Sequence, residues 1–162
     1  MTGDFSMFGF GAPPGAAPVP QPRVSGQQAS GLPRVLVIED DEAVRTVLGR
    51  VLVHAGFAPV LAASRDQAEG LIGEDIAAMV VDFRLPGSRG DLFFYYASSK
   101  FPRLRRSTVF VTGDTSIEVE QFVMHTGCPL RHKPFVHASL IGLLRSMVEP
   151  PQSPQAAPAT AG

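Results

Sequence analysis

Several short apolar runs in this sequence end in residues whose side chains can do chemistry. At these ends lie Glu39, Asp40 and Asp41 after the first run, Asp82 after the third, Thr112 after the fourth and Lys133 after the fifth. Carboxylates gathered at one place repel each other, so their ionised forms need a compensating cation. Mg²⁺ suits such a site, because it binds through one or two carboxylates and keeps several of its waters. An ion of this kind bridges a carboxylate and a phosphoryl oxygen, so the residue set predicts Mg²⁺-assisted phosphoryl transfer.

The rest of the sequence alternates five times between strand-like and helix-like patterns. The expected strands are 34–38, 57–62, 77–81, 108–111 and 130–132, and the expected helices are 42–55, 64–72, 91–100, 116–126 and 136–148. In the first helix, for example, Val44, Val47, Leu48 and Val51 recur at helical spacing, and Gly56 follows its end. Strands that alternate with helices of this length form βαβ units on a parallel sheet. The sequence therefore predicts the α/β class.

A parallel sheet would bring the chemical residues together. The carboxyl ends of parallel strands meet at one edge, and ligands collect in the crevice there. In that crevice Lys133 is expected to hold one phosphoryl oxygen as a point charge, and the Thr112 hydroxyl another.

At these residues the chain resembles the receiver domains of response regulators. The matching segments are 35–41, 80–90, 111–114 and 133–135, which stand in this order at the ends of the first, third, fourth and fifth strands. The resemblance covers about 34–149 and implies a flavodoxin-like fold. That fold has five parallel strands in the order 2-1-3-4-5 and five helices.

The resemblance also assigns roles to the site residues. It implies that Asp82 is the phosphoacceptor and that Thr112 and Lys133 are the switch residues. Glu39 and Asp40 are expected to hold Mg²⁺ together with Asp82, with Asp40 as a direct ligand and Glu39 acting partly through water. The backbone carbonyl of Arg84 is expected to be a further Mg²⁺ ligand.

Three local features accompany this assignment. Asp41 is expected to cap the first helix, where an acid suits the N-terminal position. The bond from Lys133 to Pro134 resembles the cis peptide of the family, which turns the lysine into the crevice. Arg84 and Asp114 flank the site, and we expect that they can pair across it.

The sequence departs from the family pattern on the fifth strand. Many receivers carry Tyr or Phe at the position occupied here by Leu130, so the usual aromatic switch cannot operate in that form. The stretch 122–135 looks closest to receivers attached to hybrid histidine kinases.

The resemblance implies a signalling protein rather than an enzyme with a free substrate. Its partner would be a histidine kinase or a phosphotransfer protein. Only 13 residues follow the expected domain of 34–149, so its output is expected to run through protein contacts. One alternative is a phosphate sink or kinase-inhibiting partner, and another is a pseudo-receiver that binds partners without taking phosphate. A haloacid-type hydrolase would need a second acid two residues beyond its nucleophile, where this chain has Arg84.

Composition limits the remaining possibilities. The formal net charge of −1 gives no excess of cations for nucleic acid, and no apolar run approaches the roughly 20 residues that span a bilayer. The single cysteine, Cys128, excludes an internal disulfide and fits the cytoplasmic location that we expect. Segments 1–33 and 150–162 are rich in Pro with Gly or Ala and lack hydrophobic periodicity, which predicts disordered tails around one domain of 34–149.

The expected helix 91–100 is apolar on two sides. Phe93, Phe94 and Ala97 would face the sheet, while Leu92, Tyr95 and Tyr96 would form a second apolar stripe. A stripe of this kind suggests contact with a partner or a homodimer.

Overall fold

The structure, a computed structural model, describes residues 31–148. The predicted tails, 1–33 and 150–162, lie outside the described residues apart from 31–33. No helix within the described range is long and apolar enough to cross a membrane.

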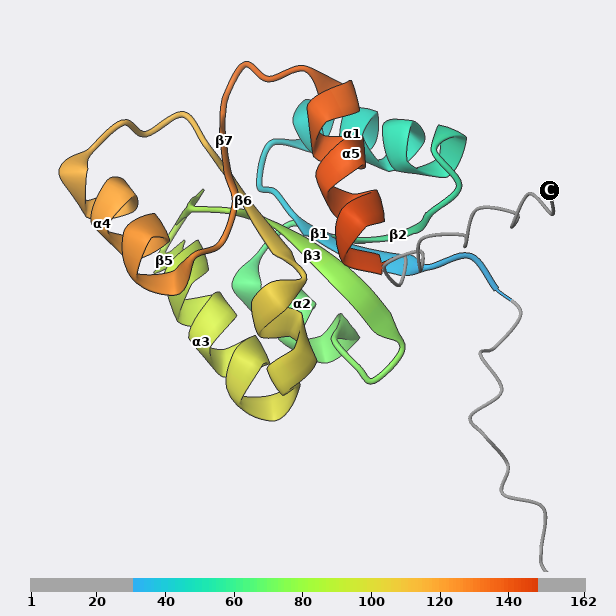
Figure 1. Cartoon of the computed structure of the whole chain (residues 1–162), viewed down its shortest axis with the longest axis horizontal. Helices are drawn as coiled ribbons and strands as arrows, with labels where there is room; N and C mark the ends of the chain where they lie inside the picture. Colours follow the sequence, from blue (N-terminus) through green and yellow to red (C-terminus); the bar gives the residue numbers. More distant parts are fainter. Residues whose placement is uncertain (1–30, 149–162) are drawn as a thin grey trace, which may run out of the picture. The chain divides into compact units, whose positions relative to one another are not determined.

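A five-stranded parallel sheet runs through the domain in the order β2-β1-β3-β6-β7 (Figure 1). Its strands are β1 (Arg34–Ile38), β2 (Ala58–Ala62), β3 (Ile76–Asp82), β6 (Thr108–Thr112) and β7 (Leu130–His132). This is the predicted order 2-1-3-4-5 when the five long strands are counted along the chain. The predicted α/β class and flavodoxin-like topology are confirmed.

In residues 31–148, five α-helices are found, and they cover the two faces of the sheet (Figure 1). They are α1 (Glu42–His54), α2 (Arg65–Leu71), α3 (Gly90–Lys100), α4 (Ile117–Thr126) and α5 (His137–Val148). Helices α1 and α5 pack on one face with Val35 and Val37 of β1, whereas α2, α3 and α4 pack on the other with Leu36 and Ile38. Because both faces are buried, the central strands are apolar throughout rather than alternating.

The start of α1 aligns the acids that precede it. The Asp41 side chain accepts a hydrogen bond of 3.0 Å from the Val44 backbone N–H, which confirms the predicted cap. A cap of this kind stabilises a helix by about 1 kcal/mol. It also fixes the chain direction immediately after Glu39 and Asp40, at the carboxyl end of β1.

The turn after Asp82 contains a feature that the sequence pattern did not predict. Strands β4 (Arg84–Leu85) and β5 (Ser88–Arg89) form a small antiparallel hairpin. Gly87, with φ of +69°, makes the turn. Gly90 closes the hairpin against β3, and a Cβ atom there would lie 2.2 Å from the Asp82 carbonyl oxygen. The hairpin is therefore seated directly on the strand that carries Asp82.

Helix α3 buries its apolar residues to different degrees. Phe93, Phe94 and Ala97 are buried, as expected. Leu92 and Tyr95 are about half exposed (49% and 48%), but Tyr96 packs partly against the core. Tyr96 is thus the least exposed member of the predicted stripe: its ring lies near Phe93, and its hydroxyl accepts a hydrogen bond from Lys100.

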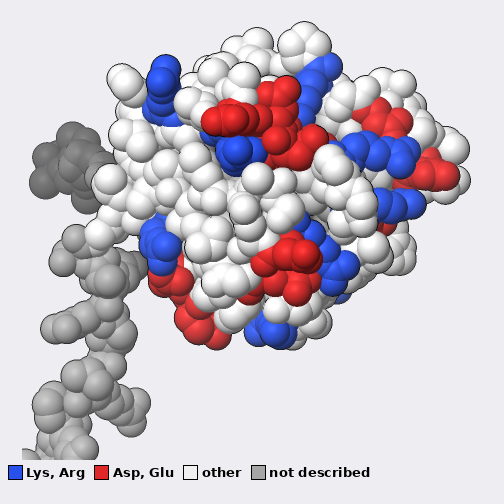
Figure 2. Space-filling view, turned by 180° about the vertical axis from the view of Figure 1, so that it is seen from behind, with Lys and Arg blue, Asp and Glu red and all other residues white. Residues whose placement is uncertain are grey.

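Acidic and basic side chains are interspersed on one face of the domain. On the face shown in Figure 2, acidic and basic residues lie close to one another rather than in patches of one sign. This distribution agrees with the small formal net charge of −1.

Candidate functional site

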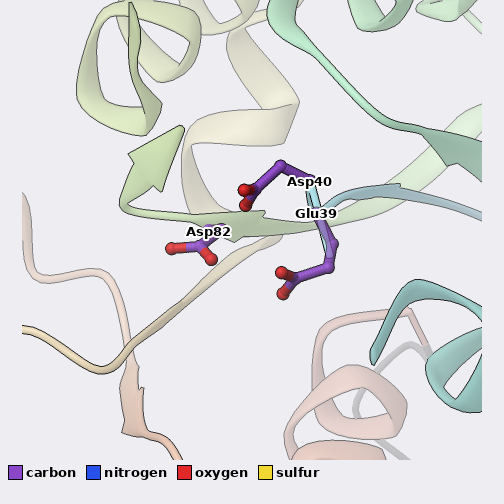
Figure 3. Close-up of side chains that lie close together, drawn as sticks. All are labelled: Glu39, Asp40 and Asp82. Carbon is purple, nitrogen blue, oxygen red and sulfur yellow. The ribbon is translucent and has the colours of Figure 1, made fainter. Parts of the chain in front are cut away.

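Three carboxylates meet at the carboxyl ends of β1 and β3. Glu39 and Asp40 follow β1 and Asp82 ends β3, and one oxygen from each lies within 4.8 Å of the others (Figure 3). Glu39 and Asp82 are buried, with 1% and 5% exposure, whereas Asp40 is exposed. Oxygen ligands at this spacing, with one side open to water, fit a hard divalent cation such as Mg²⁺. The structure thus brings together three of the predicted metal ligands.

Lys133 lies between the two buried acids. Its Nζ donates to Glu39 Oε2 and to Asp82 Oδ2, each at 2.6 Å. The residue follows β7 and is joined to Pro134 by a cis peptide bond, as predicted. Its backbone N–H also donates to the Thr112 carbonyl at 2.7 Å, so Lys133 is tied to the end of β6.

Burial and charge act in opposite directions on Glu39 and Lys133. Burial raises the pKa of Glu39; the hydrogen bond from Lys133 opposes this, and the nearby Asp82 charge adds to it, so that the pKa stays above its usual value. For Lys133, burial alone would lower the pKa, but hydrogen bonds to Asp82 and Glu39 outweigh it and raise the pKa. Burial prevails only at Glu39, because Glu39 has a single cationic partner and is repelled by Asp82, whereas Lys133 is stabilised by two carboxylates.

Asp82 is held by donors on both carboxylate oxygens. The Arg84 backbone N–H donates to Oδ1 at 2.9 Å, while Lys133 holds Oδ2. The backbone bond comes from the first residue of β4, so the hairpin orients the carboxylate. The predicted role of the Arg84 carbonyl as a metal ligand stays a prediction.

Thr112 is fully buried at the end of β6. Its Oγ1 accepts a hydrogen bond of 3.0 Å from the Asp114 backbone N–H. Among the described residues, no hydrogen bond joins Thr112 to Asp82. The hydroxyl proton is therefore available for an oxygen that enters the crevice.

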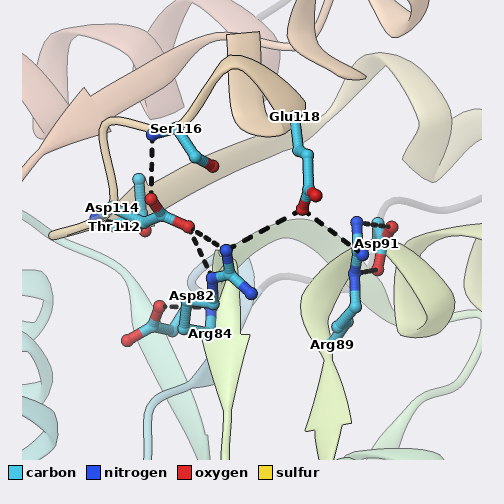
Figure 4. Close-up of polar contacts among 8 residues, drawn as sticks. All are labelled: Asp82, Arg84, Arg89, Asp91, Thr112, Asp114, Ser116 and Glu118. Atoms are coloured by element: carbon cyan, nitrogen blue, oxygen red, sulfur yellow. Dashed lines mark hydrogen bonds and ion pairs between the residues drawn. The ribbon is translucent and has the colours of Figure 1, made fainter. Parts of the chain in front are cut away.

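A chain of ion pairs crosses the mouth of the site (Figure 4). Arg84 pairs with Asp114, as predicted, and its guanidinium lies 3.9 Å from Glu118 on α4. Glu118 is also 3.8 Å from Arg89, which forms two hydrogen bonds with Asp91. The backbone N–H of residue 116, followed by the Arg84 side chain, holds the pKa of Asp114 below its usual value. The hairpin is thus linked to both α3 and α4.

Sequence reasoning did not find Arg45, which supports the acidic loop. Its guanidinium donates to the Glu39 and Asp40 carbonyls at 2.7 Å and 3.1 Å. These bonds hold the backbone on which both acids stand. The sequence feature that could have indicated this role is the position of Arg45 in the first turn of α1, four residues after the Asp41 cap.

Leu130, the predicted departure from the receiver pattern, is the first residue of β7. It is partly buried and packs on the face of the sheet that α2, α3 and α4 cover. The neighbouring aromatic contacts on that face come from Phe83, Phe110 and Phe122, whose rings meet edge to face.

Comparisons with known proteins agree with this geometry. No family model matches the sequence. A putative NtrX-like response regulator of Rickettsia bellii is 27% identical over 119 residues, which cover 71% of this chain and 24% of that protein. The transcriptional regulatory protein AruR of Pseudomonas aeruginosa is 34% identical over 65 residues, 36% of this chain and 27% of that protein. The chain thus spans about a quarter of the length of these curated relatives.

Solved structures show the same fold. A CheY-like receiver domain from Methanospirillum hungatei superposes with a TM-score of 0.66 at 22% identity, covering 73% of this chain and 94% of that one. A sensor protein from Polaromonas sp. JS666 gives 0.63 at 26% identity, covering 72% and 95%. The fold is that of response-regulator receiver domains and the curated relatives are response regulators, so the predicted resemblance is confirmed. The closeness to hybrid-kinase receivers stays a prediction.

Proposed function

We propose that this domain accepts a phosphoryl group from a histidine kinase or a phosphotransfer protein onto Asp82. The observation that carries the proposal is the buried Asp82 carboxylate, which shares one crevice with Glu39, Asp40 and Lys133. Glu39, Asp40, Asp82 and the Arg84 carbonyl would hold Mg²⁺. Signalling would then run through protein contacts, in the cytoplasm.

The residues divide the chemistry among them. An Asp82 oxygen attacks phosphorus, a P–O bond forms, and the P–N bond to the donor histidine breaks with its electron pair returning to the imidazole. Lys133, 2.6 Å from Asp82 Oδ2, neutralises charge on the arriving group, and the Thr112 hydroxyl donates to one of its oxygens. Mg²⁺ held by Glu39, Asp40 and Asp82 would supply the remaining charge neutralisation. The Arg84 N–H keeps the nucleophile oriented.

The test is phosphorylation by a small donor. Incubated with acetyl phosphate and Mg²⁺, the wild type should gain one phosphoryl mass in intact-protein mass spectrometry. Asp82→Asn should gain none, since it removes the acceptor carboxylate and keeps its shape. An equal gain in Asp82→Asn would refute the assignment.

The second candidate is a pseudo-receiver that binds partners without taking phosphate. Two observations favour it: Leu130 stands at the usual aromatic position, and Lys133 already donates a hydrogen bond to each of the two buried acids. A wild type that gains no mass from acetyl phosphate over a range of Mg²⁺ concentrations would support this candidate.

The proposal also includes a surface on α3 through which the domain contacts its partners. The predicted homodimer or partner surface comprises Leu92, Tyr95 and Tyr96 on α3, and the exposure of Leu92 and Tyr95 supports it. The partners are proteins rather than nucleic acid or membrane.

A further inference from the structure

The Arg84 guanidinium is the cation beside Asp82 that the proposed chemistry does not use. Its backbone N–H is bonded to Asp82 Oδ1, so the residue starts within hydrogen-bond distance of the acceptor. Its side chain instead extends across the mouth of the site towards β6 and α4 (Figure 4). There it pairs with Asp114 and lies 3.9 Å from Glu118.

The anions that hold Arg84 are only partly withdrawn from water. The side chains of Arg84 and Glu118 are 50% and 60% exposed, and that of Asp114 is 20% exposed. Ion pairs between exposed groups are weak, because water and salt screen them. A phosphoryl group carries more charge than a carboxylate and offers oxygens that match the planar fork of arginine. Arg84 therefore has a stronger alternative partner close to its own backbone.

We propose that Arg84 binds the phosphoryl group on Asp82 and is held in reserve by Asp114 and Glu118 until that group arrives. This inference rests on the proposed phosphorylation of Asp82. It adds a phosphoryl ligand to Lys133 and Thr112, and it makes Asp114 a competitor for Arg84 rather than a simple support.

The exchange has a consequence for α4. Glu118 lies between the two arginines of the hairpin, 3.9 Å from Arg84 and 3.8 Å from Arg89 (Figure 4). When Arg84 turns to the phosphoryl group, Asp114 loses its cationic partner. Of the two arginines of the hairpin, only Arg89 then remains near Glu118. The first turn of α4 is then less firmly tied to the hairpin. Ion pairs thus offer a route from the site to α4 that needs no aromatic residue at Leu130.

The test measures the affinity for beryllofluoride, a phosphoryl mimic, in the presence of Mg²⁺ by calorimetry. Arg84→Gln should bind beryllofluoride at least tenfold more weakly, because glutamine has no cationic fork to hold the phosphoryl mimic. Asp114→Asn should bind beryllofluoride several-fold more tightly, since it frees Arg84 and keeps the N–H that donates to Thr112. When Asp114→Asn is combined with Arg84→Gln, it should no longer increase the affinity for beryllofluoride.

Glu120→Gln is the matched control, because Glu120 is an exposed acid of α4 for which no ion pair is found among the described residues. It should leave the affinity unchanged. Unchanged affinity in Arg84→Gln would overturn the inference, and so would tightening by Asp114→Asn that persists without Arg84. The wild type distinguishes a failure of this inference from a failure of the proposed function. If only the role of Arg84 is wrong, the wild type still binds beryllofluoride and takes phosphate. If the proposed function is wrong, the wild type does neither.

Discussion

Glu39 and Asp40 are adjacent in the chain, yet the fold places them in different environments. Glu39 is 1% exposed and bonded to Lys133, while Asp40 is exposed beside it. The sequence predicted both as metal ligands from their place after β1. It could not predict which one Lys133 would contact, because that contact joins residues 94 positions apart.

The exposed acid should contribute most to metal affinity. Asp40 has no hydrogen bond to its carboxylate among the described residues, so it can bind Mg²⁺ without first losing a partner. Asp40→Asn should weaken Mg²⁺ binding at least tenfold, or about 1.4 kcal/mol, in titration calorimetry. Glu39→Gln should do less harm, since we expect Glu39 to act partly through water. Asp41→Asn is the control, because it removes a neighbouring charge and can keep the helix cap; a loss as large as that of Asp40→Asn would show a general charge effect.

The raised pKa of Glu39 makes stability depend on pH. Because its pKa lies above the ordinary 4.5, the native state keeps a proton that the unfolded chain releases. Without Mg²⁺, the contribution of Glu39 to stability should therefore fall as pH rises from about 4.5 through the raised value. Thermal melts of wild type and Glu39→Gln across this range isolate the effect by difference. Parallel pH profiles for the two proteins would contradict it.

At the scale of elements, apolar periodicity predicted most of the fold. The strands 34–38 and 130–132 have the predicted bounds, and α1 begins at Glu42 because Asp41 caps it. The hairpin was missed because β4 and β5 have two residues each, too few for a periodic pattern. The 3₁₀ helix Pro102–Arg106 was missed for the same reason, since five residues are too few to show a periodic pattern.

The contact at Gly90 should matter for both stability and chemistry. A Cβ atom there would lie 2.2 Å from the Asp82 carbonyl oxygen and 2.9 Å from Val81 Cγ1, so the hairpin would have to move. Gly90→Ala should cost about 1–3 kcal/mol of stability in urea unfolding and slow phosphorylation by acetyl phosphate. Gly142→Ala is the matched control: it lies in α5 with nothing within 4 Å of its Cβ position. It should raise stability by about 0.5–1 kcal/mol. Equal effects of the two changes would refute the packing argument.

At the scale of the whole molecule, helices cover both faces of the sheet, but the outer surface of the domain is not uniformly polar. Large apolar side chains remain exposed on α3 and α4, among them Leu92, Tyr95, Ile117 and Met124. Tyr95 also meets the Phe122 ring edge to face, so α3 and α4 share one surface there. Output through protein contacts would use a surface of this kind, because apolar side chains left in water gain free energy when a partner covers them.

Leu92 and Tyr95 are the residues with which to test this surface, although the Tyr95 ring also contacts Phe94 and Phe122. Each is about half exposed, whereas Tyr96 packs partly against the core and should be left unchanged. Leu92→Lys combined with Tyr95→Lys should keep the melting temperature within a few degrees and leave the mass gain from acetyl phosphate intact. Self-association in sedimentation velocity, or phosphoryl transfer from a cognate kinase, should fall at least several-fold, since aromatic anchors commonly carry much of the interface energy. The exposed residue Arg50 on α1, which packs on the other face of the sheet, supplies the control: in Arg50→Ala a charge changes away from α3, and association should persist. A folded double variant that associates and receives phosphate as the wild type does would exclude the α3 surface as the contact.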